Sequence, residues 1–138
     1  MSLMKKHCEL AMKAVEALAK EGIDVEVIDL RSIKPIDKSL VLESIEKTGR
    51  LVIGDVGWKT YGLSAEISAM VTENVFENLK SPILRVALPD VPAPAARTLE
   101  DEYYPKAENL ISAVKQVLDY SWSEIYIPGR KSQSIVIE

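Results

Sequence analysis

Residues 24–30 read DVEVIDL, and this short apolar stretch, which directly follows a helical pattern at residues 5–21, decides the fold class. Its Val and Ile residues are typical of a β-strand. In the preceding segment, KKHCELAMKAVEALAKE, apolar residues recur at spacings of three and four, and Gly22 follows where a helix terminator is needed. A helix, a short break and an apolar strand form the second half of a β-α-β unit, so this part of the chain predicts an α/β fold.

The rest of the sequence continues the alternation of helices and strands. Asp37 is expected to cap a short helix that runs to about Lys47 and stops at Gly49. The further expected elements are a strand beginning at 51–53, a glycine-containing loop at 54–62, a helix at 63–79, a strand at 82–88, an extended proline-rich segment from Pro89, and a helix at 106–120. This order predicts a three-layer α/β/α sandwich with a mostly parallel (mixed) sheet of four to five strands.

The last residues of the chain, 121–138, differ in character from the rest. They hold two apolar segments, EIYI at 124–127 and SIVIE at 134–138, on either side of Pro128-Gly129. A parallel crossover needs a strand before its helix, and we expect that strand to be missing ahead of residues 5–21. Unpaired strand edges recruit other strands, so we expect one of the two segments to join the sheet, within the chain or by exchange between two chains. We therefore expect a domain at 1–120 and a possibly strand-forming extension at 121–138.

Composition excludes several classes of protein. The chain has 138 residues, of which 47% are apolar, which fits one globular domain rather than a disordered segment. Its net charge of −4 and the lack of a basic stripe argue against nucleic-acid binding. No apolar run approaches the length of a membrane span, so we expect no membrane contact. The N-terminus lacks the apolar core of a signal peptide, and the expected location is the cytoplasm.

Several motifs suggest a nucleotide-binding or catalytic site, but the spacing of their residues does not match such sites. Glycines 54, 57 and 62 do not match the G-x-G-x-x-G pattern of dinucleotide-binding loops, and the Lys59-Thr60 pair lacks the glycine of a phosphate-binding loop. His7 and Cys8 are adjacent on a helix, about 100° apart, so they do not form a nucleophile–base pair. They are also too few to bind zinc, and Cys8 has no partner for a disulfide. We expect no catalytic, cofactor-binding or metal site in this chain.

Several ordered motifs resemble one known family. They are GIDVEVIDLRSIKPID at 22–37, KTGRLVI at 47–53, the AEI triplet at 65–67 after Gly62, and SPILRVALPDVPAPAARTLEDEYYP at 81–105. Over about residues 5–119 the chain resembles the transketolase C-terminal domain family. Within that family it is most similar to the β subunit of the thiamine-diphosphate-dependent E1 component of 2-oxoacid dehydrogenases.

The resemblance implies a structural and assembly role. In that family the catalytic histidine and the pyrimidine-binding domain lie upstream of this domain, and the diphosphate-binding motif lies in the α subunit. This chain is therefore expected to bind no cofactor, with thiamine diphosphate and Mg²⁺ present only in the full enzyme. The implied partners are an E1 α subunit, a second E1 β subunit and the subunit-binding domain of the E2 acyltransferase. Two alternatives remain: the equivalent domain of a transketolase or deoxyxylulose-phosphate synthase, and a free-standing interaction module.

A few residues stand out as contacts for a partner or an anion. Arg31 follows the strand at 24–30, at the sheet edge where open α/β folds place functional groups, although it also has Asp29, Asp37 and Asp55 as possible ion-pair partners. Prolines 89, 92 and 94 stiffen an extended segment, which suits either a subunit interface or a rigid connection to the last helix. The full set of candidate contact residues is Arg31, Lys34, Glu66, Pro89, Asp90, Pro92 and Pro94.

Overall fold

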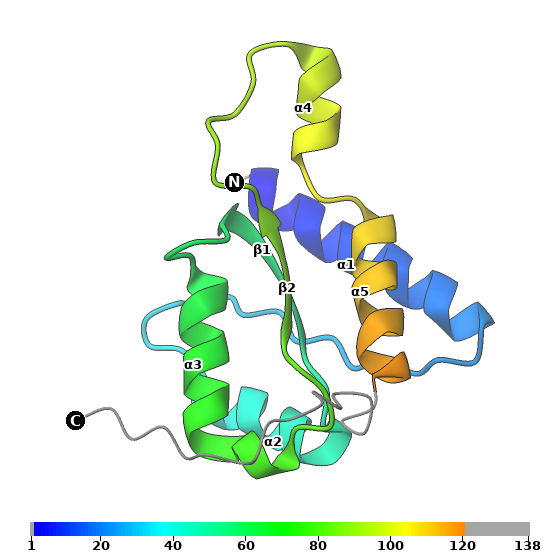
Figure 1. The fold of residues 1–138 in the computed structure, drawn as a ribbon, viewed down its shortest axis with the longest axis vertical. Helices are drawn as coiled ribbons and strands as arrows, with labels where there is room; N and C mark the ends of the chain where they lie inside the picture. The colour runs from blue at the N-terminus through cyan, green and yellow to red at the C-terminus, as the bar shows by residue number, and fades with distance from the viewer. Residues whose placement is uncertain (1, 121–138) are drawn as a thin grey trace, which may run out of the picture.

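A parallel pair of strands, β1 (Val52–Trp58) and β2 (Leu84–Leu88), lies at the centre of the computed structural model, which describes residues 2–120 (Figure 1). Val52 lies opposite Leu84 and Gly54 opposite Val86, and the pairing resumes at Trp58 and Leu88 after an irregularity. The helices are α1 (Ser2–Lys20), α2 (Lys38–Thr48), α3 (Leu63–Val75), the short 3₁₀ helix η1 (Phe76–Asn78), α4 (Arg97–Tyr103) and α5 (Ala107–Asp119).

The helices cover both faces of the strand pair. In Figure 1, α3 lies on one face, with α2 packed beside it, and α1 and α5 pack against each other on the opposite face. Parallel strands need a crossover connection, and α3 supplies the one that leads from β1 to β2. The predicted three-layer α/β arrangement with a parallel sheet is therefore confirmed.

The main hydrophobic core fills the space between the strands and the α2–α3 layer. Its buried members share an aliphatic or thioether side chain and come from α2, β1 and α3: Val41, Ile45, Ile53, Ile67, Met70, Val71 and Val75. On the other face, α1 and α5 bury Ala14, Leu18, Ala113 and Val117. Along each helix these buried residues recur mostly at spacings of three or four, as expected for a helix with one buried face.

The ends of α1 and α2 follow the sequence signals. The Asp37 carboxylate accepts hydrogen bonds from the Leu40 amide at 3.2 Å and the Ser39 hydroxyl at 2.8 Å. These bonds, the Ser39 hydroxyl first, lower the pKa of Asp37. Gly22 and Gly49 both adopt positive φ, 80° and 75°, in the left-handed conformation that ends a helix.

The prediction of a strand at residues 24–30 is wrong. These residues form no strand, and no backbone hydrogen bond among residues 2–120 joins them to β1. A strand needs a neighbour to bond its backbone, and the sequence pattern at 24–30 could not show whether one was present. The sheet of the described residues consequently has two strands, and the expected four to five are not confirmed.

Two further boundaries differ from the sequence expectation. β1 continues to Trp58 through part of the expected loop, because Trp58 pairs with Leu88 beyond the irregularity. The helix α4 begins at Arg97, where only an extended segment was expected. Residues 121–138, including the two segments expected to form strands, lie outside the described part of the chain.

Replacing Ile45 with Ala is expected to destabilise the domain by about 2–5 kcal/mol, because it leaves a cavity in the core. Ile45 is 2% exposed on α2. The matched control is Leu40→Ala on the same helix, where the side chain is 45% exposed and the expected change lies within about 0.5 kcal/mol. Chemical denaturation of both variants measures the difference, and equal losses of stability would contradict this packing.

Candidate functional site at the carboxyl ends of the strands

Asp55, a buried carboxylate in β1, organises the connection from β1 to α3. One oxygen accepts a hydrogen bond from the Gly57 amide at 2.9 Å, and the other accepts one from the Ser64 amide at 2.9 Å. Gly62, the residue before α3, has no side chain to cap the helix, so Asp55 supplies the acceptor from nine residues away. A carboxylate therefore occupies the helix start where a phosphate would bind in a nucleotide site.

The loop between β1 and α3 is held in a tight conformation. A Cβ atom at Gly62 would meet the Trp58 carbonyl oxygen, so only glycine fits there. Tyr61 adopts a φ of 56° and its side chain is fully exposed.

Asp90 ties this loop to the exit of β2. Its carboxylate accepts a hydrogen bond from the Thr60 amide at 3.1 Å and another from the Thr60 hydroxyl. The Thr60 hydroxyl, then the Thr60 amide, lowers the pKa of Asp90, and the nearby charges of Lys59 and Arg85 act in the same direction. Arg85 adds a second connection, because its guanidinium donates to the Lys59 carbonyl at 2.9 Å.

Residues 89–105, which we call the arm, leave the body of the domain beyond β2. Figure 1 shows the proline-containing segment and α4 projecting at one end of the molecule before the chain returns to α5. Tyr103 closes the base of the arm: its hydroxyl donates to the Val91 carbonyl at 2.9 Å and accepts from the Trp58 indole at 3.3 Å. The ring of Tyr104 packs edge-on against that of Tyr103, with the centroids 5.3 Å apart.

The arm presents apolar side chains to solvent. Leu99 on α4 is 59% exposed, and Val91 and Trp58 near its base are exposed by about half. Of the predicted contact residues, Pro89, Asp90 and Pro92 are exposed in the arm, and Pro94 is half-buried there.

The other predicted contact residues do not join this group. Arg31 is exposed and forms an ion pair with Asp29 at 3.6 Å, so Asp29 is the partner among the three carboxylates considered. Lys34 is exposed in the same segment, where it precedes Pro35 through a cis peptide bond. Glu66 is exposed in the first turn of α3. The structural roles of Thr60, Tyr103 and Trp58 were not predicted from the sequence, because their contacts join residues that are far apart in the chain.

Cys8 shows no sign of activation. It is half-buried on α1, and burial, followed by a hydrogen bond to Asp29 and the charge of that carboxylate, raises the pKa of the thiol, while Arg31 opposes the shift. A raised pKa keeps the thiol protonated and weakly nucleophilic. Across residues 2–120 no three His, Cys, Asp or Glu side chains gather as metal ligands. Within the same range no helix is long and apolar enough to span a membrane.

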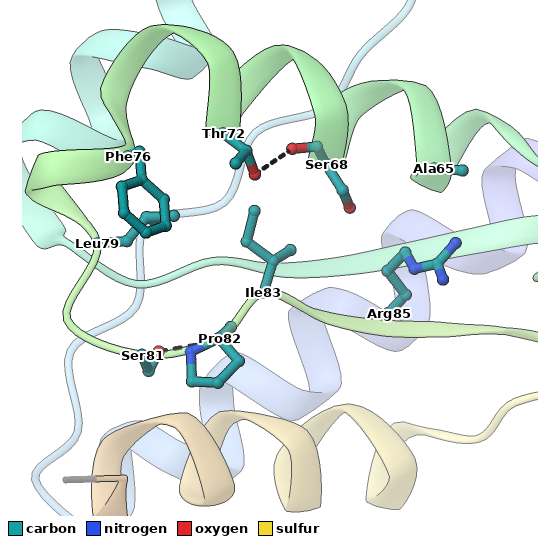
Figure 2. Close-up of a pocket in the computed structure, with 9 residues that line it drawn as sticks. All are labelled: Ala65, Ser68, Thr72, Phe76, Leu79, Ser81, Pro82, Ile83 and Arg85. Atoms are coloured by element: carbon teal, nitrogen blue, oxygen red, sulfur yellow. Dashed lines mark hydrogen bonds between the residues drawn. The ribbon is translucent and has the colours of Figure 1, made fainter. Parts of the chain in front are cut away.

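A shallow hollow of about 340 Å³ lies between α3 and the start of β2 (Figure 2). Its apolar lining includes Phe76, Leu79, Pro82 and Ile83. The hydroxyls of its lining residues Ser68 and Thr72 donate to carbonyl groups one turn earlier in α3.

Comparison with known families gives a match over most of the chain. The family described as the transketolase C-terminal domain matches residues 6–110. The chain belongs to this family.

The curated relatives that the chain resembles include several β subunits of enzymes. The chain is 45% identical to a mitochondrial pyruvate dehydrogenase E1 component subunit beta from Dictyostelium discoideum, over 77% of this chain and 30% of that protein. It is 44% identical to the same subunit from Rickettsia felis, over 82% and 35%. It is 42% identical to the β subunit of an acetoin:2,6-dichlorophenolindophenol oxidoreductase from Cupriavidus necator, over 78% and 32%. The chain spans about a third of the length of these relatives.

A solved structure supports the fold. A chain described as a split gene transketolase, an inactive beta4 tetramer, superposes with a TM-score of 0.67 at 29% identity, over 80% of this chain and 34% of that chain. This transketolase C-terminal domain therefore shares its fold with a protein whose description states an oligomeric assembly.

Substituting Gly62 with Ala is expected to destabilise the domain strongly, because the new Cβ would overlap the Trp58 carbonyl and force the loop to move. The control is Gly22→Ala, where no atom lies within 4 Å of the added Cβ and the cost is that of a positive φ alone, about 1 kcal/mol. Thermal unfolding compares the two variants. A smaller loss for Gly62→Ala than for Gly22→Ala would contradict the close approach.

The Asp90–Thr60 connection is expected to make stability depend on pH. The pKa of Asp90 is lower when folded, so its contribution is present above the unfolded value of about 3.9 and is lost as the pH falls through the folded value. Wild type is therefore expected to be more stable than Asp90→Asn at neutral pH, and the difference should shrink in acid. Denaturation at several pH values tests this, with Asp24→Asn as an exposed control. A difference that stays constant with pH would contradict it.

Proposed function

We propose that this chain is the C-terminal assembly domain of the E1 β subunit of a thiamine-diphosphate-dependent 2-oxoacid dehydrogenase. The observation that carries the proposal is the identity of 44–45% with pyruvate dehydrogenase E1 β subunits from two different organisms. The exposed apolar side chains of the arm, such as Leu99, support a role in assembly.

Two surfaces supply the contacts for this role. The arm offers Leu99, Val91 and Trp58, and the hollow beside α3 offers Phe76, which is also exposed. We assign the arm and the hollow to contacts with an E1 α subunit and a second E1 β subunit, and propose the subunit-binding domain of an E2 acyltransferase as a further partner. Among the predicted contact residues, Pro89, Asp90, Pro92 and Pro94 shape the arm, while Glu66 lies on α3. Arg31 and Lys34 form a separate exposed cationic segment.

We propose that residues 2–120 hold no site for thiamine diphosphate and Mg²⁺. The start of α3 already holds the Asp55 carboxylate, which would repel a diphosphate. We therefore propose that the rest of the enzyme binds the cofactor and that this domain contributes only to assembly. The cytoplasmic location and the sheet of four to five strands, expected from the sequence, stay predictions for the complete protein.

A second candidate is the equivalent domain of a transketolase-type enzyme. The observation in its favour is the structural similarity to a split gene transketolase chain at a TM-score of 0.67. The two candidates differ in the partner that the domain should bind. Binding of the complete β subunit to a 2-oxoacid dehydrogenase E1 α subunit in a pull-down supports the first, and binding only to a transketolase partner subunit supports the second.

The chain is expected to form dimers or larger oligomers, because its exposed apolar surfaces need partners. Replacing Leu99 in the arm with Gln should weaken association about tenfold, the effect of losing one apolar anchor. The matched control is Met12→Gln on α1, where the side chain is 50% exposed, and no change is expected. Light scattering across a concentration series measures both. A monomer at high concentration would contradict the assembly role.

Calorimetry is expected to detect no binding of thiamine diphosphate and Mg²⁺ to this chain. The physical reason is the carboxylate at the start of α3, together with glycines 54, 57 and 62, whose spacing does not form a phosphate-binding loop. A titration with Mg²⁺ alone serves as the control. Micromolar binding of the cofactor would show that the chain holds a site that this account excludes.

A further inference from the structure

The outer edge of β2, on the side away from β1, is unpaired in the part of the chain that the structure describes. The Leu84 amide and the Leu88 carbonyl both bond toward the β1 side of the sheet. Backbone groups alternate in direction along a strand, so the N–H and C=O groups of Arg85 and Ala87 point outward. Among residues 2–120, no backbone hydrogen bond reaches either residue from that side. An edge of this kind can bond to a further strand.

The side chains of β2 show the same exposure. Every residue from Leu84 to Ala87 is only half-buried, whereas Ile53 in β1 is 8% exposed. A parallel strand with neighbours on both sides and helices on both faces is normally buried. The exposure of β2 therefore comes from its open edge.

Two hollows flank this edge, one on each face of the sheet. The hollow beside α3 has Ile83 and Arg85 in its lining, and a second hollow of about 470 Å³, toward α5, has Leu84 and Val86 in its lining. Figure 1 shows β2 between α3 and α5, and Figure 2 shows Ile83 and Arg85 on the side toward α3. We call the two hollows, with β2 between them, the trough. A strand laid along β2 would place alternate side chains in the two hollows.

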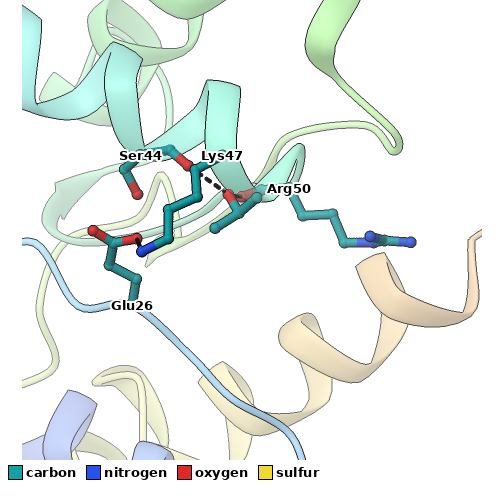
Figure 3. Close-up of polar contacts among 5 residues, drawn as sticks. Glu26, Ser44, Lys47 and Arg50 are labelled. Carbon is teal, nitrogen blue, oxygen red and sulfur yellow. Dashed lines mark hydrogen bonds and ion pairs between the residues drawn. The ribbon is translucent and has the colours of Figure 1, made fainter.

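Both helices that form the walls of the trough are tied to the β1 segment. The Asp55 carboxylate in β1 accepts a hydrogen bond from the Ser64 amide at the start of α3 at 2.9 Å. The Arg50 guanidinium, just before β1, donates to the Val117 carbonyl in α5 at 3.0 Å, and Figure 3 shows its side chain extending toward that helix. Fixed walls reduce the entropy that is lost when a partner binds.

The trough carries a net positive charge in a chain whose net charge is −4. The charged residues in the lining of the two hollows are Lys59, Arg85 and Glu102. Glu102 forms an ion pair with Lys106 at 3.1 Å. Asp90 lies near both lining cations and offsets one of them. The remaining positive charge favours a partner segment that carries carboxylates.

A second copy of β2 fits this edge poorly. Antiparallel pairing of two β2 strands would place the Arg85 side chains of both copies on the same face of the sheet and close together. Like charges on neighbouring strands are destabilising, and a charged residue on an edge strand is a common protection against self-pairing. The charge at the edge therefore selects a different protein over a second copy.

We propose that the trough binds an extended segment of a partner protein as an added strand beside β2, with apolar side chains toward α3 and acidic side chains toward α5. The outward backbone groups of Arg85 and Ala87 bond to the segment. Phe76 and Leu79 line the hollow for its apolar side chains, and Lys59 lines the hollow for its carboxylates. The inference rests on the proposed assembly role and specifies the chemistry of the segment that the hollow beside α3 receives.

An NMR titration of the full 138-residue chain with the capped synthetic peptide VEVEVEV tests the inference. The bound peptide should slow hydrogen exchange at the Arg85 and Ala87 amides by at least about tenfold. The Val86 amide, which points toward β1, should stay unchanged and report an intact fold. The peptide VKVKVKV, of equal length and opposite charge, should bind at least about tenfold more weakly. The titration needs no E1 α subunit, so its failure is distinct from a failure of the proposed assembly role.

Two variants locate the bound peptide. Ala87→Pro removes an outward N–H and keeps the bonds to β1, so it should weaken binding by at least about tenfold. Lys59→Gln should weaken binding of VEVEVEV about threefold or more. Its matched control is Lys38→Gln, an exposed cation of α2 outside both hollows, where no change is expected. If Ala87→Pro loses protection at Val86, the two lysine variants decide the test.

Four results would overturn the inference. The first is no binding of VEVEVEV at about 1 mM peptide. The second is equal binding of the two peptides, and the third is equal binding to Lys59→Gln and Lys38→Gln. The fourth is protection of Arg85 and Ala87 without peptide. Such protection at every protein concentration would mean that the chain itself fills the trough, and protection only at high concentration would assign the edge to a second copy.

Discussion

The parallel pairing of β1 with β2 is the constraint on which the rest of the structure depends. Parallel strands cannot be joined by a tight turn, so the chain crosses from β1 to β2 through α3, and α5 packs on the opposite face with α1. The same pairing brings the carboxyl ends of both strands to one end of the molecule. There Asp55 fixes the start of α3, and Asp90 joins the loop after β1 to the exit of β2.

The geometry at this end of the sheet supports the proposed role in subunit contact. In open α/β folds that position is where ligands bind, but here Asp55 satisfies the helix start from within. The chain leaving β2 extends into the arm, whose base is closed by Tyr103 against Trp58 and Val91. A rigid base with exposed apolar groups loses little entropy on binding, which suits a subunit interface.

The sequence predicted what depends on near neighbours. Helix periodicity, the Asp37 cap and the Gly49 stop need only residues within a few positions, and the structure confirms them. The prediction of a strand at 24–30 was wrong, because a strand forms only beside a partner strand, which a local sequence pattern cannot reveal. Asp90 was predicted as a contact residue, but its partner Thr60 lies 30 residues away and gave no local signal. The extended proline-rich segment predicted from Pro89 corresponds to the first part of the arm, but the helix α4 that follows it was not predicted.

Hydrogen-exchange mass spectrometry of the full chain at increasing protein concentration tests the central claim, that the arm is an assembly surface, most directly. As the chains associate, the account predicts slower exchange in peptides from residues 89–105, with little change in peptides from the exposed face of α1. Slowing confined to α1 and α5, with the arm unchanged in an associated sample, would contradict the account.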